Sequence, residues 1–202
     1  MIDVDRGEHI WTVTLNRPDK ANSLTEEMLL DLVRTMQAAK EARAVVLTGK
    51  GKVFSAGADL DAARSGLATS PLWEELSTAV AALPGFSIAA LNGTLAGGAF
   101  GMALACDMRI APPEAKFFYP AMKLGFLPQP SDPVRLRHLI GPARAKLILM
   151  SAQRLDAAEA LSFGLIDRIV PREEVPEHAL QMVAASVDAP RDIALTIKQM
   201  CH

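Results

Sequence analysis

The sequence has few of the residues from which metal sites and disulfide frameworks are built. It contains two cysteines, one in an apolar run and one at the C-terminal end, and four histidines scattered along the chain. The spacing of Cys106 and Cys201 predicts neither a disulfide framework nor a cysteine-based zinc site, and the histidines form no ligand motif. We therefore expect no metal site.

Long apolar runs, aromatic residues and an excess of one charge are also scarce. No apolar run approaches the roughly 20 residues that a membrane-spanning helix needs, and no signal peptide is recognisable. Aromatic residues make up 5% of the chain and the formal net charge is −2, so no basic stripe interleaved with aromatics is available for nucleic acid. These absences predict a cytoplasmic protein that binds neither nucleic acid nor a membrane.

What the chain has instead is a large supply of small and apolar residues. Half of its 202 residues are hydrophobic, enough for one domain with a sizeable core. Short apolar segments alternate with helical patterns, which predicts an α/β architecture. We expect a single domain over residues 1–202, with the core at about 1–140 and a helical C-terminal part at about 141–202.

The periodicity predicts individual elements along the chain. Strands are expected at 2–6, 9–15, 44–48, 86–91, 108–111, 115–118 and 166–170, and helices at 23–40, 71–83, 134–139, 142–150, 156–163, 173–185 and 193–200. Ser23 followed by Glu26 predicts a capping box for the first helix. Residues 62–69 are expected to form a weakly patterned linker, and residues 120–133, with four prolines, an irregular loop that shapes a pocket.

Two small-residue loops follow apolar segments and enter helices. One contains Gly97 and Gly98 after the strand at 86–91, and the other is 56–60 after the segment at 53–55. Unpaired N–H groups at a helix start can stabilise an oxyanion, and two such loops can aim them at one spot. The alternative is that the glycines serve tight turns and packing alone.

Motifs spread in order over nearly the whole chain resemble the crotonase family, the enoyl-CoA hydratase/isomerase superfamily. They are LNRP at 15–18, ANSL at 21–24, VVLTG at 45–49, FSAGADL at 54–60, IAALNG at 88–93, GG at 97–98, CD at 106–107 and AEALSFGLID at 158–167. The resemblance implies a spiral of ββα repeats, an acyl-CoA thioester ligand, a role in fatty acid metabolism and a homotrimer or hexamer. It implies coenzyme A as part of the substrate and no covalently bound cofactor.

The resemblance also assigns site residues. The backbone N–H groups of Ala58 and Gly98 would form the oxyanion hole that polarises the thioester carbonyl. The residues expected along the nucleotide and pantetheine of coenzyme A are Lys20, Ala21, Ala56, Asp59 and Leu60.

The sequence departs from the family pattern at the catalytic acids. Family hydratases carry one Glu three residues after the oxyanion glycine and another just after a proline, and here these positions are Gly101 and Ala121. Water addition needs one carboxylate to activate water and another group to deliver a proton. Simple hydration is therefore disfavoured, and so is the single-Glu isomerase chemistry that uses the second position. Without these carboxylates, a bulkier acyl chain would fit if neighbouring residues do not fill the space.

Two other ionisable residues are candidates for the acid or base. Gln129 stands where dienoyl isomerases and dehalogenases of the family carry an Asp, and Asp132 follows three residues later. Asp132 is the first candidate and Tyr119 the second. Alternatively, Asp132 caps a helix that starts at Pro133, and Tyr119 only lines the pocket. Arg64 is expected to be a solvated helix charge.

The family's helices continue beyond the position of Met200, so the resemblance implies a shortened helical C-terminal end, with a more open pocket or a different assembly. Two functions follow from these observations. The first is a crotonase-type lyase or isomerase that acts through an enolate, with isomerisation, decarboxylation or thioester hydrolysis as the reaction. The alternative is an inactive acyl-CoA-binding protein or a subunit that supports an active partner.

Overall fold

Two β-sheets run through the structure, a computed structural model that describes residues 1–201. Their strands are β1 (Ile2–Arg6), β2 (Ile10–Leu15), β3 (Ala44–Gly49), β4 (Val53–Ser55), β5 (Phe86–Ala90), β6 (Thr94–Ala96), β7 (Met108–Ala111), β8 (Lys116–Phe118), β9 (Leu155–Asp156) and β10 (Arg168–Ile169). One sheet has the order β1-β2-β3-β5-β7-β10 and the other β4-β6-β8-β9.

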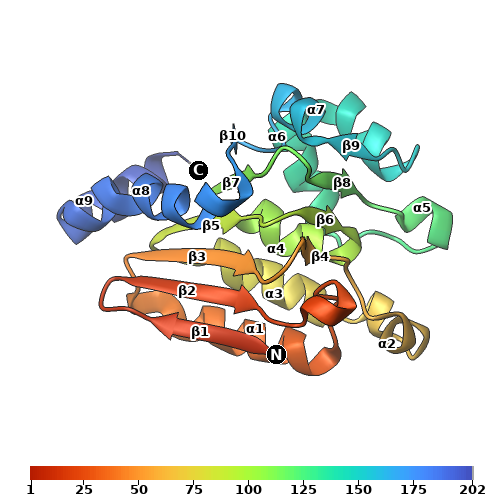
Figure 1. The fold of residues 1–202 in the computed structure, drawn as a ribbon, viewed down its shortest axis with the longest axis horizontal. Helices are drawn as coiled ribbons and strands as arrows, with labels where there is room; N and C mark the ends of the chain where they lie inside the picture. The colour runs from red at the N-terminus through yellow and green to blue at the C-terminus, as the bar shows by residue number, and fades with distance from the viewer. Residues whose placement is uncertain (202) are drawn as a thin grey trace.

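Helices surround these sheets (Figure 1). They are α1 (Glu26–Ala38), α2 (Leu60–Arg64), α3 (Leu72–Ala81), α4 (Phe100–Ala105), α5 (Ala121–Leu124), α6 (Ser131–Leu149), α7 (Ala157–Phe163), α8 (Val175–Asp188) and α9 (Arg191–Met200). Short 3-10 turns include η1 (Pro18–Lys20), η3 (Leu67–Thr69) and η4 (Gly97–Ala99).

From β3 to β8, consecutive strands alternate between the two sheets. β3, β5 and β7 pair in parallel in the larger sheet, while β4, β6 and β8 pair in parallel in the smaller one. Helices follow the pairs β3–β4, β5–β6 and β7–β8, which makes each repeat a ββα unit. The predicted α/β class with a ββα spiral is therefore confirmed.

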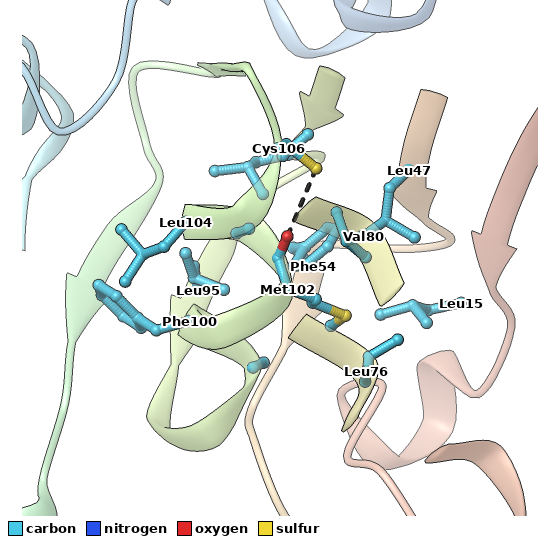
Figure 2. Packing of buried hydrophobic residues seen from close by; sticks show 14 of the residues in the cluster. Leu15, Leu47, Phe54, Leu76, Val80, Leu95, Phe100, Met102, Leu104 and Cys106 are labelled. Atoms are coloured by element: carbon cyan, nitrogen blue, oxygen red, sulfur yellow. Dashed lines mark hydrogen bonds between the residues drawn. The ribbon is translucent and has the colours of Figure 1, made fainter. Parts of the chain in front are cut away.

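Apolar side chains from both sheets meet the helices in one large buried cluster. Figure 2 shows members of this cluster from β2, β3, β4, α3, β6 and α4, among them Leu15, Leu47, Phe54, Leu76, Val80, Leu95, Phe100, Met102, Leu104 and Cys106. The opposite face of β3, β5 and β7 is covered by α8, where Val175, Ala179 and Val183 are buried. Burial on both faces explains why these strands are continuous apolar runs rather than alternating ones.

Several local predictions were wrong. The strand β6 was missed, because its three residues lie between Gly93 and Gly97. Helix α1 is capped by Thr25, whose hydroxyl accepts from Met28 N at 3.3 Å, and the hydroxyl of Ser23 instead accepts from Arg17. The expected capping box at Ser23 is therefore absent from this part of the described chain.

The two expected loops also contain helices. The linker at 62–69 holds the end of α2 and the turn η3, and the loop at 120–133 holds α5 and the start of α6. The predicted helices at 134–139 and 142–150 are two parts of α6, broken at Gly141, where φ is 79° and ψ is 163°. A glycine can adopt this conformation, and Pro142 can begin the second segment.

Helix α9 is attached to the rest of the molecule by polar groups. The Lys198 ammonium donates to Asp107 Oδ2 at 2.7 Å and to the Gly85 carbonyl at 2.8 Å, and Arg191 pairs with Glu41 at 3.1 Å. None of the ten residues described for α9 is buried. Charged contacts and partly buried residues such as Leu195 therefore attach α9, with no fully buried side chain among those described.

Candidate functional site

The two small-residue loops meet in the structure. A Cβ atom on Gly57 would lie 3.3 Å from Gly97 Cα and 3.4 Å from Gly98 N, and the φ angles of Gly57 and Gly97 are 89° and 58°. Left-handed φ angles and this close approach both favour glycine. The structure thus brings the predicted donor loops of Ala58 and Gly98 into contact.

The backbone N–H groups of Ala58 and Gly98 are not used by the hydrogen bonds of the neighbouring bridge and helical turn. Leu24 forms an isolated parallel bridge with Ala58, through bonds that use Gly57 O and Asp59 N rather than Ala58 N. Gly98 is the second residue of η4, and amides of a first helical turn have no acceptor within the helix. Both amides are therefore suited to an anionic oxygen.

The five residues expected along coenzyme A lie on two adjoining segments. Ala56 N donates to Ala21 O at 3.0 Å, and Ala21 follows Lys20 with a left-handed φ of 51°. Leu60 starts α2 and its side chain is exposed. The carboxylate of Asp59 is engaged, because it pairs with Arg17 at 2.8 Å and caps α2. Hydrogen bonding from Arg17 lowers the pKa of Asp59. The backbone N–H of Asp59 donates to Leu24 O and its carbonyl accepts from Ala63 N, so this residue is held in place on all sides.

The two candidate acid–base residues are in contact. Tyr119, just after β8, donates its hydroxyl to Asp132 Oδ2 at 3.0 Å. Asp132 is the second residue of α6 and is completely buried. Among the described residues no partner is found for its Oδ1, and no backbone amide is capped by its carboxylate. The capping alternative therefore does not describe this side chain.

Burial shifts the protonation of both groups. It raises the pKa of Asp132 to about 7, against the opposing effects of the Tyr119 hydrogen bond and the Arg135 charge. Burial, followed by the nearby Asp132 charge, raises the pKa of Tyr119 above its ordinary value. Near neutral pH Asp132 is thus present as both acid and base, whereas Tyr119 stays a hydroxyl donor.

Comparison with known proteins shows the family. A sequence model of the enoyl-CoA hydratase/isomerase family matches residues 5–202. A provisionally named enoyl-CoA hydratase from Thermus thermophilus is 35% identical and shares 97% of this chain and 81% of its own length. The chain belongs to the enoyl-CoA hydratase/isomerase family.

Solved structures of this family have the same architecture. An enoyl-CoA hydratase from Bacillus anthracis superposes with a TM-score of 0.89 at 32% identity, covering 98% of this chain and 81% of that one. An enoyl-CoA hydratase/isomerase from Pseudoalteromonas atlantica gives a TM-score of 0.91 at 27% identity, covering 99% and 82%. This family member therefore shares its fold with a solved protein named enoyl-CoA hydratase and with one named enoyl-CoA hydratase/isomerase.

In this member of the enoyl-CoA hydratase/isomerase family, the space at Gly101 is occupied. A Cβ atom at that position would lie 3.0 Å from Asp132 Oδ1 and 3.4 Å from Ser77 Cβ. The expected room for a larger acyl chain at residue 101 is therefore filled by a carboxyl group. Ala121, the other replaced position, starts α5 and is also buried.

Trp73 and Glu74 on α3 were missed by the sequence analysis. A Cβ on Gly98 would lie 3.1–3.2 Å from ring carbons of Trp73, whose indole N–H donates to Leu67 O at 2.7 Å. The Glu74 carboxylate accepts from Ser131 N and Oγ at 3.2 and 2.9 Å. The sequence carries no local signal for either contact, because each joins α3 to a segment distant in sequence.

Other features of the described chain lie apart from this site. Within residues 1–201, no group of three or more His, Cys, Asp or Glu side chains is placed to hold a metal ion. No helix in that range combines the length and apolar character needed to cross a bilayer. Arg64 is exposed and pairs with Asp61 at 3.3 Å, as expected for a solvated charge.

A hollow of about 920 Å³ lies against α9, away from the loops of Ala58 and Gly98. Its lining includes Leu104, Cys106, Leu139, Leu195 and Lys198 but none of the four candidate catalytic residues. Burial raises the pKa of Cys106 to about 12, so this thiol stays protonated and weakly nucleophilic.

Proposed function

We propose that this protein acts on an acyl-CoA thioester and stabilises the enolate oxygen with the amides of Ala58 and Gly98. The contact between their two loops supports this, because two preorganised donors in one place favour developing negative charge. Lys20, Ala21, Ala56 and Leu60, with the backbone of Asp59, would contact coenzyme A. The family membership supports an acyl-CoA ligand.

The observation that carries the reaction type is the unpartnered Oδ1 of buried Asp132. A carboxyl group with a pKa of about 7 can remove a proton from the acyl α-carbon and return it at the γ-carbon. Tyr119 would hold the carboxyl group by its hydrogen bond to Oδ2. We therefore favour isomerisation of an enoyl-CoA, in which one acid–base group performs both proton transfers.

The other reactions fit less well. Hydration would need a second group, and both hydratase positions lack a carboxylate, as Gly101 and Ala121 stand there. Decarboxylation would bring a substrate carboxylate near Asp132, which is unfavourable whenever Asp132 is charged. Thioester hydrolysis would require an activated water next to the same single carboxyl group.

A second candidate function is acyl-CoA binding without turnover, in a binding protein or a subunit that supports an active partner. The burial of Asp132 favours it, because an acyl group must displace the covering side chains before it can reach Oδ1. The enzyme and the binding protein are distinguished by turnover.

The test is incubation of the purified protein with a panel of thioesters in D2O. The panel contains 2-enoyl, 3-enoyl, 3-hydroxyacyl and malonyl-type CoA, analysed by chromatography with mass spectrometry. Isomerisation gives a new enoyl peak with deuterium incorporated from the solvent. We expect D132N to slow it by about 10²–10⁴-fold, whereas D61N, a change at an exposed carboxylate of α2, leaves it unchanged.

Each other outcome has a meaning. Water addition to a 2-enoyl-CoA would contradict the argument from the two missing glutamates. Retention of thioesters with no change in any of them would support the binding function. We further propose that the protein is cytoplasmic and forms a homotrimer or hexamer. Size-exclusion chromatography with light scattering would test the oligomeric state.

A further inference from the structure

Gly101 and Asp132 compete for the same space. Gly101 is buried on α4, and a Cβ there would lie 3.0 Å from Asp132 Oδ1 and 3.7 Å from Asp132 Cγ. Contacts of 3.0 Å to a Cβ are closer than normal van der Waals packing allows. A side chain at residue 101 would therefore press on the carboxyl group of Asp132 and require it to shift.

The start of α6 is held where it presents Asp132 to α4. Two residues of α3 contact it: Glu74 accepts from Ser131 N and Oγ, and Ser77 Oγ accepts from Arg135 Nη1 at 2.7 Å. These contacts lie on both sides of Asp132 in the sequence. The position of its carboxyl group is thus fixed by α3 as well as by the hydrogen bond from Tyr119.

We propose that Gly101 is the socket for the carboxyl group of Asp132, so that α6 supplies the acid that a side chain on α4 would otherwise supply. The catalytic part of this inference rests on the proposed function, while the steric part does not. The missing carboxylate at residue 101 on α4 is then replaced by the carboxyl group of Asp132 on α6, and the absence of a side chain at Gly101 provides the space for it.

Thermal unfolding of G101A, D132A and G101A/D132A tests the socket without any activity assay. Replacing Gly101 by Ala presses a methyl group against Asp132 Oδ1, and we expect a fall in Tm of several degrees. In the D132A background the same methyl group has space, so the fall should largely disappear. Equal falls in both backgrounds, or failure of both G101A and G101A/D132A to fold, would show that Asp132 is not the obstacle.

Activity then tests the exchange of the acid between helices. We expect D132A to lose at least 100-fold in turnover and G101E/D132A, with its carboxylate returned to α4, to recover at least tenfold over D132A. Unchanged turnover in D132A would contradict the acid–base role of Asp132 in the proposed function. The steric role of Gly101 would then be decided by the thermal unfolding experiment alone. No recovery in G101E/D132A, with D132A inactive and both variants folded, would overturn the exchange alone.

Discussion

Gly98 in η4 and Gly101 in α4 lie three residues apart, and side chains of α3 contact both positions, but their surroundings differ in chemistry. Gly98 lies on the ring of Trp73, whereas Gly101 lies beside Asp132 Oδ1. At both positions a Cβ would lie closer to its neighbour than normal packing allows, so glycine is favoured. At the first the neighbour is a rigid apolar ring, and at the second it is an ionisable group.

The difference shows how the two halves of the site are made. The proposed oxyanion half consists of backbone amides, so it needs only a turn geometry and a support beneath it. The proposed acid half consists of one side chain, Asp132, on α6, so it needs space beside Gly101 on α4 and contacts from α3 that hold the start of α6. Substitutions should therefore affect the first half through the backbone and the second through charge and volume.

The largest effect is expected from G98P. Proline removes the donor N–H, and loss of one oxyanion donor costs about 10²–10³-fold in turnover; the added ring also presses on Trp73, so we expect turnover to be abolished. The matched variant G98A keeps the amide and adds a methyl group at the same place, so its loss should be smaller. Steady-state kinetics measure both, and equal losses would assign the effect to Trp73 rather than to the amide.

The next effect concerns stability and pH at Asp132. Its pKa is raised from 3.8 to about 7 in the folded protein, so folding takes up a proton, and stability falls as pH rises through this window and is constant above it. By linkage, the free energy of unfolding falls by an amount on the order of 4 kcal/mol as pH rises from below 3.8 to above 7. Measured by urea unfolding between pH 4.5 and 7.5, the free energy of unfolding should therefore fall more steeply with pH for wild type than for D132N.

Parallel pH profiles of wild type and D132N would mean that Asp132 is solvated in solution. D61N provides the control, because Asp61 is exposed and its variant should follow the wild-type profile.

A smaller effect is expected from W73F. Phenylalanine keeps an apolar ring under Gly98 but leaves Leu67 O without its donor at 2.7 Å. We expect a loss of about 1–3 kcal/mol in the free energy of unfolding and only a modest loss of turnover. A variant as stable as wild type would mean that solvent replaces the indole N–H.

The smallest effect is expected from R17M, which removes the partner of Asp59 next to the Ala58 amide. Because the pKa of Asp59 is lowered in the folded protein, the pair contributes stability above the ordinary pKa of Asp and loses it as pH falls through the folded value. The pair is partly exposed, so the loss at neutral pH should be about 1 kcal/mol or less. Unfolding at pH 7 and in acid checks this: the difference between wild type and R17M should shrink as Asp59 is protonated but should not vanish, because Arg17 also donates to Ser23 O and Oγ.

The meeting of the two small-residue loops could be predicted from the sequence because its determinants are local. The glycines at 57, 97 and 98 follow apolar strands, and family motifs surround them, so both the loops and their convergence were expected. The fold class was predictable for the same reason, as the apolar runs of β3 and β5 and the capping box at Asp156 identify their elements directly.

The acid half was only partly predictable because its geometry is long-range. Asp132 and Tyr119 could be selected as ionisable residues, but their contact depends on how α5 and α6 return to α4. Asp132, which occupies the space beside Gly101, lies 31 positions further along the sequence. Periodicity carries no information on that distance, nor on the contacts of Trp73 and Glu74.

The attachment of α9 has a consequence for how the molecule opens. A segment held by Lys198 and Arg191 and without a buried residue among those described contributes little to the cooperative core. It can detach while β3 and β5 remain paired, because partial opening costs only the contacts that are broken. Amide hydrogens of α9 should therefore exchange with solvent well before those of the central strands. Salt should weaken the exposed Arg191–Glu41 pair more than the largely buried Lys198–Asp107 pair.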